Sequence, residues 1–356
     1  MLSRPKRYVG LLFIILCLCT GCGQNQPVQR SGIIMDTAVT LTASGDEAKA
    51  AIDESMARLK NLENMVSPNV PDSDVNKLAQ SAGSGRWVAL NPEVYQMLAV
   101  AQEYARKTNG AFDVTTKPLI DLWGIGTEHA KVPAPAELAA AQKLVGWQKL
   151  ELDEESHSAR LLQKGMGVDL GGIAKGLAVD EVRKIYAKYG IKDGLINLGG
   201  SSLYALGYNK DGMPWRIGLR HPRKDDGQEK MAVLPLTNAA LSTSGDYERF
   251  FEVNGVRYHH IIDPRTGRPA QSGATSVTIV AADNVPAGGM LTDLLTTAVF
   301  VMGPEAGARF IRSQQGIEGA IIDGRYQLWT TGDMAQTLED VSPEFQFWQE
   351  SGGDGL

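Results

Sequence analysis

Residues 319–330, GAIIDGRYQLWT, decide the fold class. Two apolar-rich runs, 319–323 and 326–330, are separated only by Gly324 and Arg325. A connection this short joins antiparallel strands, because parallel strands need a crossover of about a dozen residues or more. The stretch therefore predicts a β-hairpin and favours an antiparallel sheet over a doubly wound parallel one.

The same arrangement recurs along the chain, where strand-like runs stand in pairs with short Gly, Asn or Asp turns between them. These further runs are 33–42, 147–152, 159–163, 194–198, 215–220, 231–237, 256–262 and 275–281. Helical patterns with start or stop signals cover 46–64, 91–110, 135–145, 175–189, 292–302 and 304–315. The clearest has Asn91 as its N-cap, Pro92 in its first turn and Gly110 as its stop. We expect an α+β fold, with mainly antiparallel sheets and packed helices.

The N-terminus has the pattern of a lipoprotein signal. Basic residues precede an apolar run, 9–18, that is too short to span a bilayer comfortably, and Cys22 directly follows two small residues. We expect residues 1–21 to be a signal peptide and Cys22 to carry lipid. Residues 22–31 would then tether the protein to the extracytoplasmic face of the cell membrane. An uncleaved anchor and an ordinary secretory signal are the alternatives.

The remaining chain shows no second linker and no internal repeat. We expect residues 32–335 to form one domain, or two closely packed halves, followed by a tail over 336–356. The formal net charge is −6, and loss of the three basic signal residues makes it more negative, which argues against a nucleic-acid surface. All three cysteines lie at or before Cys22, so no internal disulfide is expected. Five histidines without a spare cysteine give no zinc cluster.

Two glycine-containing segments have features of a ligand site. GAFDVT at 110–115 combines a glycine for close backbone approach, the flat apolar face of Phe112 and the hydrogen-bond acceptor Asp113. DLGGIAKG at 169–176 runs from a strand into glycines and then a helix, where backbone groups and Lys175 can meet phosphates. Taken singly, each segment also fits a structural turn.

Three hydroxyl-rich or histidine-containing turns extend this pattern. INLGGS at 196–201 and LSTSGDY at 241–247 are expected to be turns that form anion-binding nests, although ordinary turns have the same composition. HHIIDPRTG at 259–267 begins with two histidines at a strand end, where successive side chains point to opposite faces. At most one of His259 and His260 therefore faces any given site.

A pair of oxygen ligands begins an apolar helix. Asp293 and Thr297 are four residues apart, so they project from one helix face. Carboxylate and hydroxyl oxygens suit Mg²⁺, which takes its remaining ligands from water and substrate phosphates. Taken alone, the pair is also explained by a helix N-terminal charge and a core hydroxyl.

Taken together and in this order, these segments resemble the ApbE family of FAD:protein FMN transferases. The resemblance runs from about Met35 to Trp329 and rests on GAFDVT, DLGGIAKG, INLGGS, LSTSGDY, HIIDPRTG and TDLLTTAVFVMG. It implies an ApbE-like, T-fold-like catalytic domain that uses Mg²⁺ to transfer FMN from FAD to a Thr or Ser hydroxyl, releasing AMP. The implied acceptor is a membrane or surface electron-transfer protein with a flavinylation motif.

The resemblance also implies roles for individual residues. Magnesium would be held by the side chains of Asp293 and Thr297 and the carbonyl of Gly172. His260 would assist catalysis, and its ordinary pKa near 6.5 suits a base at neutral pH. The residues implied in FAD binding are Met35, Asn69, Ala111, Phe112, Asp113, Asp169, Lys175 and Ile262.

Two positions depart from the family pattern. Asp36 follows Met35 where the family often has glycine, and Asn69 stands where relatives often have an aromatic residue. Loss of that aromatic face removes a stacking contact of about 0.5–1.5 kcal/mol, so we expect looser isoalloxazine binding. The role of Lys175 stays open between neutralising a phosphate and pairing with Asp169.

Two other functions fit the same residues. Water in place of the acceptor hydroxyl would give FAD hydrolysis to FMN and AMP at the same metal site. A flavin-binding or solute-binding lipoprotein without catalytic activity would need a pocket but no metal.

Overall fold

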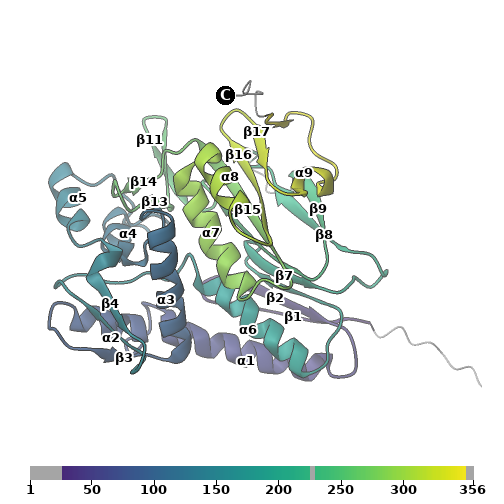
Figure 1. The fold of residues 1–356 in the computed structure, drawn as a ribbon, viewed down its shortest axis with the longest axis horizontal. Helices are drawn as coiled ribbons and strands as arrows, with labels where there is room; N and C mark the ends of the chain where they lie inside the picture. Colours follow the sequence, from purple (N-terminus) through teal and green to yellow (C-terminus); the bar gives the residue numbers. More distant parts are fainter. Residues whose placement is uncertain (1–25, 225–228, 350–356) are drawn as a thin grey trace, which may run out of the picture.

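A nine-stranded sheet organises the fold (Figure 1). The computed structural model describes residues 26–224 and 229–349, so the predicted signal peptide (1–21) and Cys22 lie outside the described residues. Every neighbouring pair in the sheet is antiparallel except the last. In spatial order the strands are β1 (Val28–Ile34), β2 (Thr37–Ala43), β6 (Gly194–Leu198), β7 (Ser202–Leu206), β10 (Ala239–Gly245), β15 (Ala274–Ala282), β16 (Ile317–Asp323), β17 (Gln327–Thr330) and β18 (Gln346–Phe347). The predicted α+β class is confirmed.

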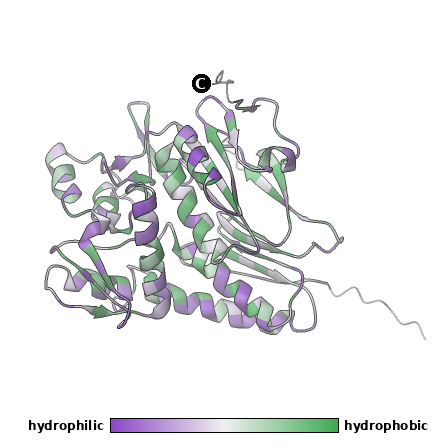
Figure 2. Ribbon diagram, viewed as in Figure 1, coloured by the Kyte–Doolittle hydropathy of each residue, from purple (hydrophilic) through white to green (hydrophobic). Residues whose placement is uncertain are grey.

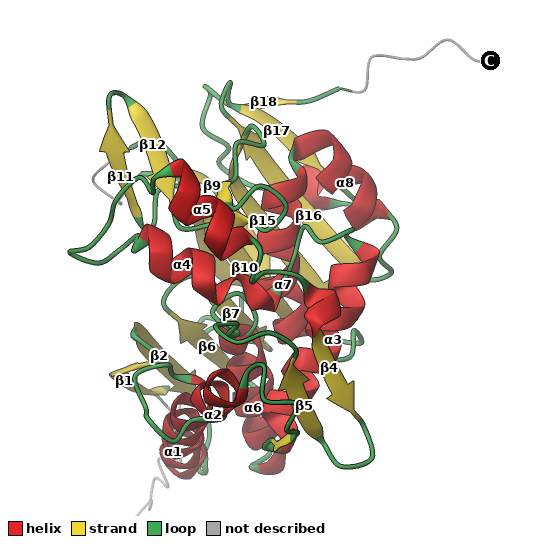
Figure 3. Ribbon diagram, turned by 90° about the vertical axis from the view of Figure 1, so that its left-hand side faces the viewer, coloured by secondary structure: helices red, strands yellow, loops and turns green. Residues whose placement is uncertain are grey.

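Helices cover one face of this sheet. Residues 74–161, from α2 to β5, form a second lobe beside these helices (Figures 1 and 3). The helices are α1 (Ala48–Val66), α2 (Asp74–Ser81), α3 (Pro92–Lys107), α4 (Lys117–Trp123), α5 (Pro135–Gln142), α6 (Ala174–Lys188), α7 (Gly288–Met302), α8 (Pro304–Arg312) and α9 (Met334–Thr337), with short 3-10 turns at Val114–Thr116 and Trp147–Lys149. The smaller sheets are β3–β5–β4 (Val88–Ala89, Ser158–Leu161, Leu150–Asp153), β8–β9 (Trp215–Arg220, Lys230–Leu236), β11–β12 (Phe250–Val253, Val256–His259) and β13–β14 (Ile262–Asp263, Arg268–Pro269). Helix α7 lies at the centre of the helix layer and is predominantly hydrophobic (Figure 2).

Strand alternation divides the interior into two cores. Successive side chains of a strand point to opposite faces, so Tyr204 and Ala240 join the core beneath the helices. Leu203 and Leu241 join a second core on the other face, which β9 and Met334 of α9 cover. Because both faces are buried, the sheet does not show a simple alternation of apolar and polar residues.

The structure confirms the hairpin that the opening stretch predicts, and it corrects three boundaries. β16 and β17 pair antiparallel. The run 33–42 is not one strand, because Met35 and Asp36 have positive φ and form the tight turn of the β1–β2 hairpin. Residues 28–31, predicted as tether, belong to β1. The described part of the predicted tail, 336–349, packs on the domain: Glu339 pairs with β9, Phe345 is buried and β18 extends the sheet.

The remaining corrections concern glycine and hydroxyl residues. Most of the segment 241–247, predicted as an anion-binding turn, is β10 in the middle of the sheet. Its serines and threonines find partners across the strand and on α7, which makes a buried strand of this composition stable. Helix α7 begins at Gly288, four residues before the predicted start.

Helices α6 and α7 cross at two glycines. A Cβ on Gly176 would stand 2.2 Å from the carbonyl oxygen of Gly289, and one on Gly289 would stand 2.6 Å from that of Gly176. Two carboxylates connect the helices reciprocally: Asp180 of α6 accepts the N–H groups of Gly289 and Met290, and Asp293 of α7 accepts that of Gly176. Backbone contact and side-chain capping together fix where α7 starts relative to α6.

We predict that Gly176→Ala destabilises the protein by about 1–3 kcal/mol or more, because the added methyl collides with backbone that has no room to move. Urea unfolding measures the change. Gly324→Ala is the matched control, since a Cβ there meets nothing within 4 Å, and its stability should stay within about 0.5 kcal/mol. Equal stability of the two variants would contradict the tight crossing.

Candidate active site

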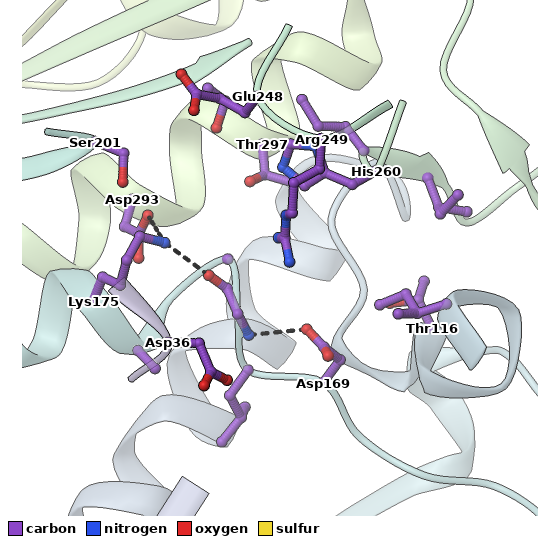
Figure 4. Close-up of a pocket in the computed structure, with 18 of the residues that line it drawn as sticks. Asp36, Thr116, Asp169, Lys175, Ser201, Glu248, Arg249, His260, Asp293 and Thr297 are labelled. Atoms are coloured by element: carbon purple, nitrogen blue, oxygen red, sulfur yellow. Dashed lines mark hydrogen bonds and ion pairs between the residues drawn. The ribbon is translucent and has the colours of Figure 1, made fainter. Parts of the chain in front are cut away.

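One cavity of about 550 Å³ opens where the sheet, the helix layer and the second lobe meet (Figure 4). Its size lies in the range of small-molecule sites, about 300–1,000 Å³. The β1–β2 turn, the loop before α6, the middle of α7 and the stem of the β11–β12 hairpin all contribute to the wall. Segments that are far apart in the sequence therefore share one space.

The predicted site residues gather around this cavity, with one exception. Those that line it are Met35, Ala111, Phe112, Asp113, Asp169, Gly172, Lys175, His260, Ile262, Asp293 and Thr297. Asn69 does not: it is exposed, and its N–H donates to Ser67 Oγ at 3.1 Å. Its neighbours Ser67 and Pro68 do reach the wall.

The carboxylate of Asp293 is buried and fully engaged. Its Oδ2 accepts the N–H of Gly176 at 3.0 Å, and its Oδ1 accepts the hydroxyl of Ser202 at 3.3 Å. The ammonium of Lys175 lies 3.5 Å from the same Oδ1 and donates to the Gly171 carbonyl (Figure 4). The lysine thus supplies the counter-charge of Asp293.

In the described structure Lys175 pairs with Asp293 and not with Asp169, the partner that the sequence had offered. Oδ1 of Asp169 instead accepts the N–H of Gly171 at 2.9 Å and closes a turn of the loop before α6 (Figure 4). This turn holds the adjacent Gly172 against α7. A Cβ on Gly172 would stand 3.2 Å from Thr297 Oγ1 and 3.3 Å from the ring of Phe112.

The donors around Asp293 fit magnesium. Asp293 and Thr297 lie one turn apart on α7, and the Gly172 backbone reaches the same turn. The described residues contain no group of three or more His, Cys, Asp or Glu that would hold a metal by themselves. A site with one carboxylate, one hydroxyl and one carbonyl suits a cation such as Mg²⁺, which keeps water and phosphate oxygens in its shell.

The two histidines point to opposite sides, as the strand geometry predicts. His259 is buried, with Nε2 2.9 Å from the Ala270 carbonyl and its ring edge-on to Phe300. His260 lines the cavity, and its buried Nδ1 has no hydrogen-bond partner in the described structure. His260 is therefore the histidine available to a ligand.

The surroundings of His260 lower its pKa below the value expected from the sequence. Burial disfavours the charged ring, and the positive charge of Arg249 opposes protonation, so the pKa of His260 falls to about 3. The ring is neutral at pH 7 and free to accept a proton, but it is a weak base until negative charge enters the cavity. The pKa near 6.5 assumed from the sequence is wrong for the folded protein.

The carboxylate of Asp113 is occupied within the protein. Its Oδ1 accepts from the backbone and hydroxyl of Thr115, and Oδ2 accepts the N–H of Trp147 at 2.8 Å. Burial raises the pKa of this carboxyl above its ordinary value. These bonds shape the GAFDVT turn and set the position of Phe112 at the cavity wall.

The sequence analysis did not assign Asp36, Glu248 and Arg249 to the site, although all three line the wall; Ser201, the end of the INLGGS segment, lines it as well (Figure 4). Asp36 was noticed only as a departure from a family pattern. Arg249 lies two residues after the LSTSGDY segment, and the pairing of β11 with β12 places it beside the cavity. Strand β11 shows little alternation in burial: Phe251 is half-buried and the other three residues are exposed.

Comparison with known proteins gives one consistent family. The ApbE family model matches residues 35–321. The FAD:protein FMN transferase of Treponema pallidum (strain Nichols) is 33% identical over 334 residues, covering 88% of this chain and 90% of that protein. The protein of the same name from Klebsiella pneumoniae (strain 342) is 33% identical over 299 residues, covering 84% and 90%.

Two solved structures share the fold. The ApbE protein from Thermotoga maritima superposes with a TM-score of 0.78 at 30% identity, covering 88% of this chain and 99% of that one. The flavin transferase ApbE from Vibrio cholerae gives 0.78 at 29% identity with the same coverage.

We predict that His260 makes the folded protein less stable in acid. Below pH 6.5 the unfolded chain binds a proton on this residue, whereas the folded chain does not until the pH approaches 3. Its contribution is therefore present above pH 6.5 and lost as the pH falls, by at most about 1.4 kcal/mol per pH unit. Urea unfolding at pH 7 and pH 4.5 should show a smaller acid loss for His260→Gln than for the wild type.

The control is His129→Gln, because the His129 side chain is 83% exposed and should leave the acid loss unchanged. If the two variants and the wild type lose equal stability between the two pH values, His260 is not held neutral by its surroundings.

Proposed function

Because the chain belongs to the ApbE family, we propose that it is a magnesium-dependent FAD:protein FMN transferase. It would move FMN from FAD to a threonine or serine hydroxyl of an acceptor redox protein and release AMP. The observation that carries this proposal is the cavity itself. The side chains of Asp293 and Thr297, the ring of His260 and the cations Lys175 and Arg249 all belong to residues that line one space.

Cleavage of a diphosphate depends on neutralising charge more than on covalent help from the protein. Gly172, Asp293 and Thr297 would hold Mg²⁺, which when bound supplies positive charge to the diphosphate and to the departing AMP. Lys175 already balances Asp293. When the carboxylate of Asp293 binds a cation, the ammonium of Lys175 is free to contact a phosphate oxygen. The same lysine would therefore have an anionic partner with and without substrate.

His260 would handle the proton. The acceptor hydroxyl oxygen forms a bond to the FMN-side phosphorus, the bond from that phosphorus to the AMP oxygen breaks, and the hydroxyl proton passes to a ring nitrogen of His260. The ring is neutral before the reaction, as a base must be. The negative charge of the substrate phosphates favours the protonated ring and raises its proton affinity above that in the free protein.

Location would favour acceptors on the same membrane. We propose that lipid on Cys22 holds the enzyme at the extracytoplasmic face, as the signal pattern indicates. Tethering raises the local concentration of enzyme near a membrane-bound acceptor without any added contact.

We predict that mixing the protein with FAD, Mg²⁺ and an acceptor domain gives an acceptor whose mass increases by one FMN. Asp293→Asn should lower the transfer rate by about 100-fold or more, because one oxygen ligand of the cation loses its charge. Flavin binding should persist in this variant, since Lys175 is then free to meet phosphate. Mass spectrometry of the acceptor and fluorescence titration of FAD measure the two quantities.

Asp211→Asn is the control, because Asp211 is 65% exposed and is not among the residues that line the cavity. AMP release that does not depend on the acceptor would show that the protein is an FAD hydrolase and not a transferase. Flavin binding with neither AMP release nor labelling would indicate a binding protein.

We further predict that His260→Ala slows transfer by about 100-fold or more while AMP and the FMN adduct still form in equal amounts. The slowing should depend on the acceptor hydroxyl, since a base acts on that proton. Single-turnover labelling with saturating FAD measures it. A normal rate in this variant would remove His260 from the mechanism and leave the rest of the proposal standing.

A further inference from the structure

Arg249 is a cavity cation without a carboxylate partner. It lines the cavity and its guanidinium points into it (Figure 4). Its aliphatic part packs over Gly126, where a Cβ would stand 3.1 Å from Arg249 Cδ. No described carboxylate lies within 4.0 Å of its nitrogens, although Asp36, Asp169 and Glu248 line the same cavity.

The backbone fixes Arg249 beside His260. In the β11–β12 hairpin, Phe250 pairs with His259, and the N–H of His260 donates to the carbonyl of Arg249 at 3.0 Å. Arg249 and His260 are thus opposite each other at the stem of the hairpin. Directly opposite residues of antiparallel strands project to the same face, so both side chains border the same part of the cavity.

The hairpin itself is anchored, which keeps this pair in place. The ring of Tyr258 stacks on Phe251 at 5.2 Å and on Trp123 of α4 at 5.5 Å. Trp123 is fully buried, and its Nε1 donates to the carbonyl of Gly267. The guanidinium therefore extends from a rigid stem, although Arg249 itself is exposed.

Several other charged groups of the cavity already have partners within the protein. Lys175 pairs with Asp293, Arg220 lies 3.7 Å from Glu248, and Asp169 accepts a backbone N–H. A guanidinium with five N–H donors and no acid beside it is suited to a planar anionic group, and a phosphate accepts two of its N–H groups at once.

We propose that Arg249 binds a phosphate group of the flavin substrate and lets the site distinguish phosphorylated flavin from riboflavin. This inference rests on the proposed function for the identity of the substrate. It assigns to the β11–β12 stem two adjacent tasks, with Arg249 holding phosphate charge and His260 receiving the proton next to it.

Fluorescence titration with FAD and with riboflavin tests this, using the full chain and the variants Arg249→Gln and Arg249→Lys. Arg249→Gln should weaken FAD binding about 10-fold or more, with riboflavin affinity unchanged, because only FAD carries the phosphates. Arg249→Lys should recover part of the loss. Arg309→Gln is the control, since Arg309 is 72% exposed on α8, and it should change neither affinity.

Unchanged FAD affinity in Arg249→Gln, or an equal loss for FAD and riboflavin, overturns the inference, since the residue would then be idle or would contact the ring. The proposed function fails differently. In that case the wild type binds FAD but neither labels an acceptor nor releases AMP, and the ratio of the FAD and riboflavin affinities still reports on Arg249.

Discussion

The crossing of α6 and α7 at Gly176 and Gly289 is the constraint on which the site depends. Contact between the two backbones leaves no room for a side chain, and it brings Asp180 and Asp293 each to the first turn of the opposite helix. Buried carboxylates are costly unless hydrogen-bonded, and helix N-termini supply N–H donors and a favourable dipole. Asp293 can therefore lie buried at the cavity with its charge balanced before any ligand arrives.

Hydroxyl groups connect this crossing to the sheet. Ser242 and Ser244 of β10 meet Thr292 and Thr296 of α7, each pair at 2.9 Å, and Ser202 of β7 reaches Asp293. An interface between sheet and helix is ordinarily apolar, but small polar residues allow close approach and satisfy one another. The register of α7 on the sheet is thus set by hydrogen bonds as well as by packing. The same register fixes the position of Thr297 at the cavity.

The sequence was sufficient for the architecture and for most of the cavity wall, but not for β10, the β1–β2 turn or Arg249. Apolar runs separated by two-residue turns identify hairpins such as β16–β17, because that signal is local. Strand β10 reads as a turn because its serines and threonines are satisfied only by tertiary partners. Met35 and Asp36 adopt positive φ without glycine, which the hairpin imposes and local preference opposes.

The two cations that line the cavity differ: Lys175 is paired with a carboxylate in the described structure, and Arg249 is not. Lys175 is committed to Asp293 in the ligand-free protein, so it can meet a phosphate only when another cation takes its place. Arg249 has no such partner, and it lies beside a histidine that burial and then this positive charge keep neutral by lowering its pKa. Substrate phosphate placed there offsets the charge of Arg249 and at the same time makes His260 a stronger base. Binding and proton acceptance are therefore coupled through one arginine, without any movement of the backbone.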